Sequence, residues 1–569
     1  MNNSEIAKIF YEIADLLEIK EVQFKPRAYR NAARTIESLS ESIADLYKSD
    51  KPPKLPGIGV NIAKKIKELV TTGKLEYLEN LKSEFPPILI KLLRIPGIGP
   101  KTVKLIKNNL QINTIHDLIS AIKHHKIRNI KGLGPKTEEL ILKYIDLLKD
   151  RQKRHLLFDV ISLANKIKEI LQNHDSIIDI EIAGSIRRKK ETVKDIDLVC
   201  TSNNHEKTME FFTTLPDISE VKLKGLTRCS VVISNISIDL RIVDKDNFGS
   251  ALLYLTGSKE HNIALRKLAN SYNFKLNEYG LFGENSILIT SKTENDIYKK
   301  LNMQWIPPEL RENRGEIEAA QKNQIPELIT FTDIQGDFHI HTHYSDGNNS
   351  IQEIASHAKS MGYQYICISD HTKGYMPGGL GVDKNSLQKQ IDEINRLNET
   401  LDNFIILKGV EANILPDGKL DIPNNLLKDL DIVIASLHSG LRQDKQKITN
   451  RIITAMSNDY VNILGHPTCR LINKRPPIDL ELPLIVETAV NNNILLEINA
   501  YPNRLDLNDI NTHYAVQHQC KLAIGTDAHS LNHLKFMEFG IYTARRGWAS
   551  SDDIINSLTI EKLKHRLNI

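Results

Sequence analysis

The sequence predicts a multidomain protein with a helical amino-terminal region, an α+β centre and a carboxyl-terminal β/α barrel. Glycine hairpins separate helical patterns before residue 150. Strand-like segments with carboxylates follow near residues 195 and 239, and from residue 336 short apolar strands alternate with helical patterns. A chain of 569 residues has room for three to five such units, each with its own core.

Composition narrows the class of protein. The apolar content of 41% is ordinary for a water-soluble chain, and no run of 18 apolar residues occurs. The charged start of the sequence does not match a secretory signal. Five scattered cysteines without a CxxC pair predict a reducing compartment and no Cys-based zinc site. We expect a cytoplasmic monomer with no membrane contact.

The amino-terminal region repeats one short motif three times, at residues 55–60, 95–100 and 131–135. Each copy joins two helical patterns and resembles the helix-hairpin-helix motif, whose backbone N–H groups hold DNA phosphates without reading bases. A single copy is also consistent with an ordinary helix connector, but three copies favour DNA binding. The predicted DNA-binding residues are Gly57, Gly59, Gly97, Gly99, Gly132, Gly134 and Lys25.

Charge supports a nucleic-acid partner for this region. Residues 1–150 hold 26 Lys and Arg against 18 Asp and Glu, whereas residues 151–335 are balanced and residues 336–569 have a net charge of −4. A basic region on a near-neutral chain is typical of sequence-independent phosphate contact, which salt weakens.

Three carboxylates mark the centre of the chain. Asp195 and Asp197 lie two residues apart in a β-prone run, so one strand points both to the same face. Asp239 lies in SVVISNISIDLRIV, which predicts two strands around a turn at Asn235. Converging carboxylates suit Mg²⁺ or Mn²⁺ bound with substrate phosphates. For the Asp-x-Asp pair alone, a solvated strand edge is an equally good interpretation.

Neighbouring motifs favour the metal site. Gly184 permits close backbone approach, and Ser185 and Arg188 are able to donate to phosphate oxygens. In this order and spacing, GS, Asp-x-Asp, the third Asp and YLTGS at 254–258 make residues 155–320 resemble the family X DNA polymerases.

The resemblance implies roles for individual residues. Asp195, Asp197 and Asp239 would hold two metal ions and act in catalysis, and Ser185 and Arg188 would bind the incoming deoxynucleoside triphosphate. The remaining residues implied at the nucleotide are Gly184, Tyr254, Gly257 and Asn262, with Arg266 facing the template. Lys194 stands where the family commonly has Gly, and Leu255 replaces an aromatic residue. These departures bear on triphosphate affinity and sugar discrimination.

Lys65 matches the position of a Schiff-base lysine in the small amino-terminal domain of the family. The resemblance therefore extends to a 5′-deoxyribose-phosphate lyase, for which Lys64 would help to depress the pKa of the amine. Another lysine of the family's lyase site corresponds to Asn61 here. We therefore prefer the interpretation that this helix face binds a 5′-phosphate.

In the last third, imidazoles and carboxylates come at the carboxyl ends of predicted strands, as in DFHIHTH and GTDAH. A β/α barrel gathers such residues at one face. Any one buried His is more often structural, but the full set predicts a polynuclear metal site: His339, His341, Asp346, His371, Glu411, His438, His466, Asp527 and His529. Mixed ligands of this kind suit two or three ions of Mn²⁺, Zn²⁺ or Fe²⁺.

Residues 336–569 resemble the PHP (polymerase and histidinol phosphatase) domain, with all nine ligand positions filled and Glu411 bridging two ions by analogy. Such ions lower the pKa of a bound water for attack on a phosphoester. Arg442, Arg470 and Lys474 are candidates to receive the scissile phosphate, with surface solvation as the alternative.

The sequence thus predicts a bacterial-type family X DNA polymerase with a PHP domain that acts as a 3′→5′ exonuclease or phosphoesterase, filling short gaps with a 5′-phosphate in base excision repair. One alternative is a DNA-binding nuclease with vestigial polymerase activity; a small-molecule phosphatase fits the hairpins poorly. The predicted parts are a lyase-like domain (1–85), hairpin fingers (86–150), palm (151–245), thumb (246–315), linker (316–335) and PHP domain (336–569).

Overall fold

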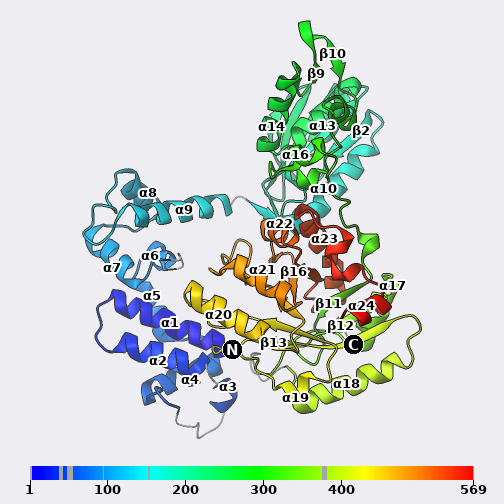
Figure 1. The fold of residues 1–569 in the computed structure, drawn as a ribbon. Helices are drawn as coiled ribbons and strands as arrows, with labels where there is room; N and C mark the ends of the chain where they lie inside the picture. Colours follow the sequence, from blue (N-terminus) through cyan, green and yellow to red (C-terminus); the bar gives the residue numbers. More distant parts are fainter. Residues whose placement is uncertain are drawn as a thin grey trace.

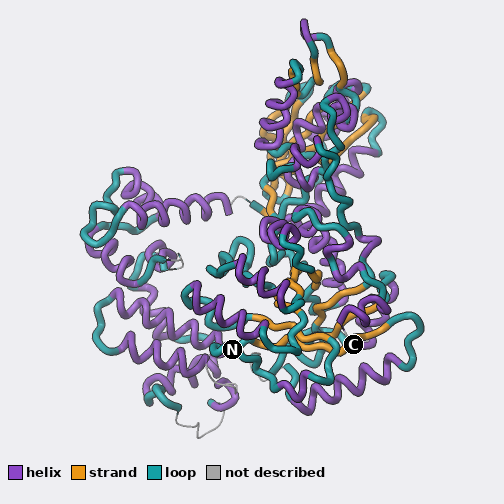
Figure 2. The backbone as a smooth tube through the Cα atoms, in the orientation of Figure 1, coloured by secondary structure: helices purple, strands orange, loops and turns teal. Residues whose placement is uncertain are grey.

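The computed structural model describes residues 3–37, 43–47, 55–93, 95, 97–151, 154–373 and 381–567. Pro96 of the second glycine motif lies outside the described residues. The fold class agrees with the prediction: helices alone are described before residue 152, a mixed sheet follows, and a parallel barrel ends the chain (Figures 1 and 2). None of the described helices has the length and apolar character needed to span a bilayer.

The amino-terminal region packs its helices around one continuous apolar core, which runs from Ile6 to Ile145. Residues 1–85 and 86–150 therefore share a core. Their helices are α1 (Asn3–Ile19), α2 (Lys25–Glu37), α3 (Ile43–Leu46), α4 (Val60–Thr72), α5 (Glu76–Ser83), α6 (Pro87–Leu92), α7 (Pro100–Asn109), α8 (Ile115–Lys123) and α9 (Pro135–Arg151).

The palm sheet places the central carboxylates. Its strand order is β2-β4-β7-β6-β5, with β4 and β7 parallel and the other pairs antiparallel. The predicted turn at Asn235 is present, because Ser234 and Asn235 adopt positive φ between β6 and β7. The palm elements are β1 (His155–Leu156), α10 (Leu157–Gln172), β2 (Ile177–Ile182), α11 (Gly184–Arg187), β3 (Thr192–Val193), β4 (Asp195–Ser202), α12 (His205–Thr213), β5 (Ile218–Lys224), β6 (Arg228–Ile233) and β7 (Ile236–Ile242).

The thumb has its own apolar core, from Leu253 to Leu328, so part of the segment predicted as a linker (316–335) packs with the thumb. At its centre the buried carboxylate of Glu294 accepts hydrogen bonds from Arg187 and Arg311. Paired buried charges of this kind satisfy each other. The elements are α13 (Phe248–Thr256), α14 (Lys259–Ser271), β8 (Lys275–Asn277), β9 (Gly280–Phe282), β10 (Leu288–Thr290), α15 (Glu294–Lys300) and α16 (Glu316–Gln321).

The carboxyl-terminal part is a nearly closed barrel of parallel strands in the order β11 to β17, and Ile340 of β11 bridges to Ala528 after β17. The alternation of short apolar strands and helices predicted from residue 336 is present. Strands and helices alternate as β11 (Gly336–Ile340), α17 (Ile351–Ser360), β12 (Tyr365–Ile368), α18 (Lys384–Asn398), β13 (Ile405–Asn413), α19 (Asn424–Leu427), β14 (Ile432–Ser436), α20 (Lys445–Met456), β15 (Ile463–Gly465), α21 (Leu482–Asn491), β16 (Leu495–Asn499), α22 (Asp509–Gln517), β17 (Leu522–Gly525), α23 (Met537–Arg546) and α24 (Ile560–Leu567).

The palm and thumb stand against the barrel at α22 and α23, while the helical region lies beside the barrel and α9 leads from it toward the palm (Figure 1). Apolar and charged contacts join palm and barrel. Phe158 of α10 meets Phe536 and Phe539 edge-on, and Glu191 accepts from Arg470 at 2.6 Å. The two units therefore meet through a packed interface.

Candidate functional sites

The three palm carboxylates converge as predicted. Asp195 and Asp197 share one face of β4, and the parallel register sets Asp197 opposite Asp239 of β7. Burial, followed by the charges of Asp195 and Asp239, raises the pKa of Asp197 to about 7. Like charges this close favour a cation among them, and their oxygen ligands fit a hard divalent ion such as Mg²⁺.

Gly184 begins α11 directly against this cluster. It adopts φ +61°, and a Cβ at this position would lie 2.0 Å from Oδ2 of Asp197. Only glycine therefore lets the Gly184–Ser185 backbone approach the carboxylates so closely.

A pocket of about 810 Å³ opens beside the carboxylates. It is lined by every residue predicted to bind the nucleotide and by the two that depart from the family pattern: Gly184, Ser185, Arg188, Lys194, Tyr254, Leu255, Gly257, Asn262 and Arg266. Asn262 donates to the carbonyl of Tyr254 at 2.8 Å, and Arg266 donates to that of Asn262 at 3.2 Å. The barrel contributes to the same pocket through Asn508, Asp509, Ile510 and Arg546, which the sequence did not indicate.

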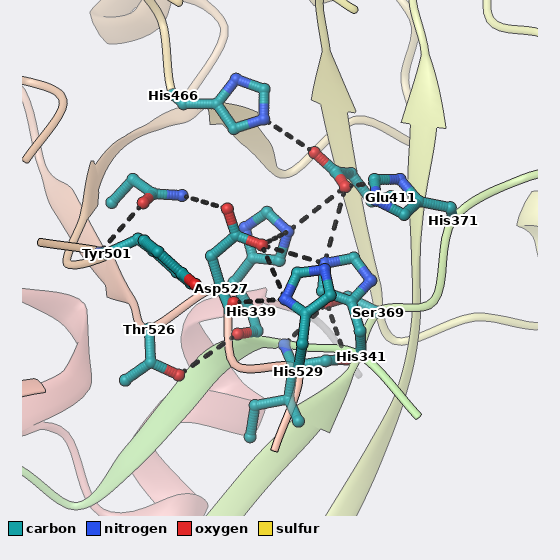
Figure 3. A network of polar contacts seen from close by, with 12 residues as sticks. His339, His341, Ser369, His371, Glu411, His466, Tyr501, Thr526, Asp527 and His529 are labelled. Atoms are coloured by element: carbon teal, nitrogen blue, oxygen red, sulfur yellow. Dashed lines mark hydrogen bonds and ion pairs between the residues drawn. The ribbon is translucent and has the colours of Figure 1, made fainter. Parts of the chain in front are cut away.

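The predicted ligands of the barrel also come together, at the carboxyl-terminal mouth (Figure 3). Strand periodicity explains this, since Glu411 shares the inward face of β13 with Leu407, and Asp527 follows Ala523 of β17 at the same spacing. Three groups have ligand atoms within 4.8 Å of one another: His341, Asp346, His371 and His529; His339, His341 and Asp527; His371, Glu411 and His438.

Glu411 lies at the centre of this cluster. Its Oε2 is 2.8 Å from Nδ1 of His371, and its Oε1 is 3.0 Å from Nε2 of His466 and 3.2 Å from Nε2 of His438. Burial opposes ionisation, yet the surrounding imidazoles hold the pKa of Glu411 well below its usual range. One carboxylate facing several imidazoles has the arrangement of a bridging ligand.

Several buried atoms of these residues make no hydrogen bond within the part of the chain that the structure describes, among them both ring nitrogens of His341 and Nε2 of His339. Buried polar atoms without partners are costly. Burial and the nearby His529 and His371 also lower the pKa of His341 to about 3, which leaves the neutral imidazole that metal binding needs. The donor set therefore fits divalent metal ions.

Two charged residues at this mouth were missed by sequence analysis. Glu497 of β16 accepts a 2.6 Å hydrogen bond from Nδ1 of His339 and one of 2.5 Å from the backbone N–H of His466. Arg504 lies with Nε 3.4 Å from Oδ2 of Asp527. The sequence did contain a signal for Glu497, which is a carboxylate within the apolar run ILLEIN. A buried strand rarely carries a charge without a partner, so such a residue indicates a buried ion pair or a functional site.

The three loop cations proposed for the scissile phosphate are placed differently. Arg470 is buried against Glu191 of the palm and the carbonyl of Leu505, so neither solvation nor an open phosphate site describes it. Arg442 is exposed with NH1 3.8 Å from Oδ2 of Asp15, and Lys474 is exposed.

In the helical region, the first glycine of each hairpin has positive φ, with values of 76° at Gly57, 85° at Gly97 and 93° at Gly132. The second glycines, Gly59, Gly99 and Gly134, directly precede helices α4, α7 and α9, and a Cβ on any of them would meet nothing within 4 Å. The hairpins therefore present open backbone at three helix N-termini.

Lys65 and Lys25 lie in helices of the same region. The ammonium of Lys65 in α4 lies 4.3 Å from the ring centroid of Tyr77, and Tyr77 stacks on Tyr29. Lys25 begins α2. These contacts leave the chemical role of Lys65 a prediction.

Comparison with known proteins gives four family matches. They are a helix-hairpin-helix domain (residues 1–75), a SAM-like helix-hairpin-helix tandem (89–145), a DNA polymerase beta thumb (251–312) and a PHP domain (337–500). A probable phosphatase of Thermoanaerobacter sp. (strain X514) is 32% identical over 41% of this chain and 93% of that protein.

Two polymerases are also similar to the chain. DNA polymerase lambda of Arabidopsis thaliana is 25% identical over 54% of this chain and 62% of that protein. "DNA polymerase/3′-5′ exonuclease PolX" of Bacillus subtilis (strain 168) is 35% identical over 99% of both chains. With palm carboxylates, thumb, hairpins and PHP barrel in one chain, the protein belongs to the bacterial PolX family, the family X DNA polymerases that end in a PHP domain.

Proposed function

We propose that the protein is a template-directed DNA polymerase that fills short gaps in base excision repair and trims 3′ ends with its PHP domain. The observation that carries the proposal is the presence of two separate clusters of candidate metal ligands, one in the palm and one in the barrel, on a chain with three glycine hairpins. A full-length relative named for both activities supports it.

In the palm, Asp195, Asp197 and Asp239 hold Mg²⁺ or Mn²⁺. When bound, the ions neutralise charge on the attacking and leaving oxygens of phosphoryl transfer. Ser185 and Arg188 bind the triphosphate, since both donate hydrogen bonds and both line the pocket beside the carboxylates. Tyr254, Gly257 and Asn262 border the sugar and base, Arg266 faces the template, and Gly184 lets the backbone approach the phosphates.

In the barrel, the nine clustered residues would hold two or three ions of Mn²⁺, Zn²⁺ or Fe²⁺, with Glu411 at the centre of the donor set. When bound, the ions activate water for attack on a phosphodiester. Glu497 holds the ring of His339 in place, and Arg504 is the cation nearest the ligand Asp527. We assign Arg504 to the scissile phosphate, because Arg470 is committed to the palm.

The DNA partner is a gapped duplex with a 5′-phosphate on the downstream strand, bound by a monomer. The basic region of residues 1–150 supports this choice. Lys25 and Lys65 contact the 5′-phosphate. A 5′-deoxyribose-phosphate lyase reaction at Lys65 is the second role for the same residue, and the match of its position to the family's Schiff-base lysine favours it.

The test separates the two sites by mutation. Asp239→Ala should abolish extension of a primer on gapped DNA and leave trimming in place. His341→Ala or Asp527→Ala should abolish trimming of an end-labelled primer without nucleotides and leave extension in place. Extension and trimming are each measured with Mg²⁺ and with Mn²⁺, and metal content is determined for every protein. We expect Mn²⁺ to support trimming better than Mg²⁺, because six imidazoles favour the softer ion.

Two results would contradict the proposal. Loss of both activities in a folded Asp239→Ala protein would show that the sites are not independent. Trimming that persists in His341→Ala protein depleted of metal would assign the nuclease to another site or to a contaminant.

A further inference from the structure

One arginine of the barrel reaches into the polymerase half of the molecule. Arg546 ends α23, and its side chain is only 3% exposed. It donates to the backbone carbonyl of Arg188 at 2.7 Å, to Oε1 of Glu312 at 3.1 Å and to Oδ2 of Asp509 at 2.6 Å. It also donates to the backbone carbonyl of Glu309 at 3.4 Å. An arginine buried with four acceptors is held in one orientation and holds its partners in turn.

Arg188 is held from both sides by this arrangement. Its own Nε donates to Oε1 of Glu312 at 3.1 Å, and its NH1 donates to the carbonyl of Thr256. Its main chain is fixed by Arg546. The residue proposed to bind the triphosphate therefore takes its position from a neighbouring domain.

Glu312 is shared by three cations. Besides Arg188 and Arg546, Lys190 lies with Nζ 3.5 Å from its Oε2. All four side chains line the pocket beside the palm carboxylates. A triphosphate oxygen that takes the Nε of Arg188 displaces Glu312 from it, and Glu312 then keeps Arg546 and Lys190 as partners. The carboxylate is thus never left buried without a counter-charge.

We infer that Arg546 of the PHP domain is a positioning residue for nucleotide binding. It holds the backbone of Arg188 through the carbonyl of that residue, and it keeps Glu312 in place when the triphosphate replaces Glu312 as the partner of Arg188. The inference rests on the proposed polymerase function. It makes the barrel part of the nucleotide site and gives Glu312 the role of a competitor for Arg188.

The neighbouring Arg545 provides a matched control. It lies on the same helix and also binds the polymerase half, donating to Oε1 of Glu309 at 2.8 Å and to the carbonyl of Ile329 at 2.8 Å. It does not line the pocket. A variant at Arg545 therefore weakens the contact between the domains without touching Arg188 or Glu312.

The experiment uses full-length Arg546→Met, Arg546→Lys, Glu312→Gln and Arg545→Met proteins. KM and kcat for a deoxynucleoside triphosphate are measured in gap filling, and equilibrium affinity is measured on gapped DNA with Ca²⁺. Arg546→Met should raise KM about tenfold with kcat nearly unchanged, as loss of a charge-assisted contact predicts. Arg546→Lys should restore most of the affinity, and Arg545→Met should match wild type. Glu312→Gln should lower KM, because the competitor has lost its charge.

Retained trimming activity and thermal midpoint show that each variant is folded. An unchanged KM in folded Arg546→Met, an equal rise in Arg545→Met, or a higher KM in Glu312→Gln would overturn the inference. Wild-type protein that binds the nucleotide but extends no primer would defeat the proposed polymerase, while the affinity series would still decide the role of Arg546. Wild-type protein that binds no nucleotide would defeat both.

Discussion

Glu497 shows how one buried charge orders a metal site. It lies on β16 between apolar neighbours, with about 1% of its surface exposed, and accepts from the ring of His339 and the backbone of His466. The hydrogen bond at Nδ1 of His339 leaves Nε2 of the same ring able to bind a metal ion. This Nε2 lies 3.4 Å from Oε2 of Glu411. A single carboxylate thereby sets the tautomer of one ligand and the backbone position of another.

Glu497→Gln should lower metal content and trimming activity about ten- to a hundredfold, the usual effect of removing an outer-shell partner of a ligand histidine. Extension should be unchanged, since the palm ligands are elsewhere. Metal content is measured after dialysis, and trimming is assayed on an end-labelled primer. The exposed Glu487 of α21 supplies the control Glu487→Gln. Full metal occupancy and full trimming activity in Glu497→Gln would show that Glu497 does not stabilise the metal site.

In each of the three hairpins, the two glycines have different structural roles. The first glycine of each has the positive φ that the turn requires, and the second stands in open space at the start of a helix. The first position is therefore needed for folding, and the second is available to a DNA backbone. The inward-facing positions of the barrel strands are also of two kinds. Apolar residues fill the interior, and the candidate metal ligands follow them at the mouth.

Gly99→Ala and Gly134→Ala should each weaken binding to gapped DNA about fivefold without lowering the thermal midpoint. The added methyl meets no protein atom within 4 Å, but it stands beside the N–H groups offered to a phosphate and weakens their hydrogen bonds, each worth about 1.5–3 kcal/mol to a charged group. Affinity is measured by fluorescence anisotropy. By contrast, Gly97→Ala should lower the midpoint, because φ there is 85°. Unaltered affinity in both second-glycine variants would show that these hairpins do not contact DNA.

For the whole molecule, charge is unevenly distributed. The helical region has 26 basic against 18 acidic residues, while the barrel segment from residue 336 has a net charge of −4. The barrel is bound to the palm by packed aromatic rings and ion pairs. We infer that the basic region attracts DNA, and that the palm site and the barrel site, which are held together by this interface, act on it.

A 5′-phosphate at the downstream end of a short gap should tighten binding about tenfold over a 5′-hydroxyl, since lysines of the helical region meet an added charge. Lys25→Ala and Lys65→Ala should each reduce this difference, whereas Lys123→Ala, at the exposed end of α8, should preserve it. Titrations at two salt concentrations measure the effect. Equal affinity for both ends would mean that the region reads only the duplex.

The sequence by itself determined the parts whose information is local. The strand period placed Asp195 and Asp197 on one face, the turn at Asn235 followed from its residue type, and the barrel followed from short apolar runs that alternate with helical patterns.

Tertiary structure alone decided the partners of charges far apart in the chain. Arg470 pairs with Glu191 across 279 residues, Arg546 reaches the carbonyl of Arg188 across 358, and residues 1–85 share a core with 86–150. Periodicity reports which face of an element is buried, but not which other element covers it. The physical reason is that a buried charge takes whichever counter-charge the packed domains bring to it, and that choice exists only once they are packed.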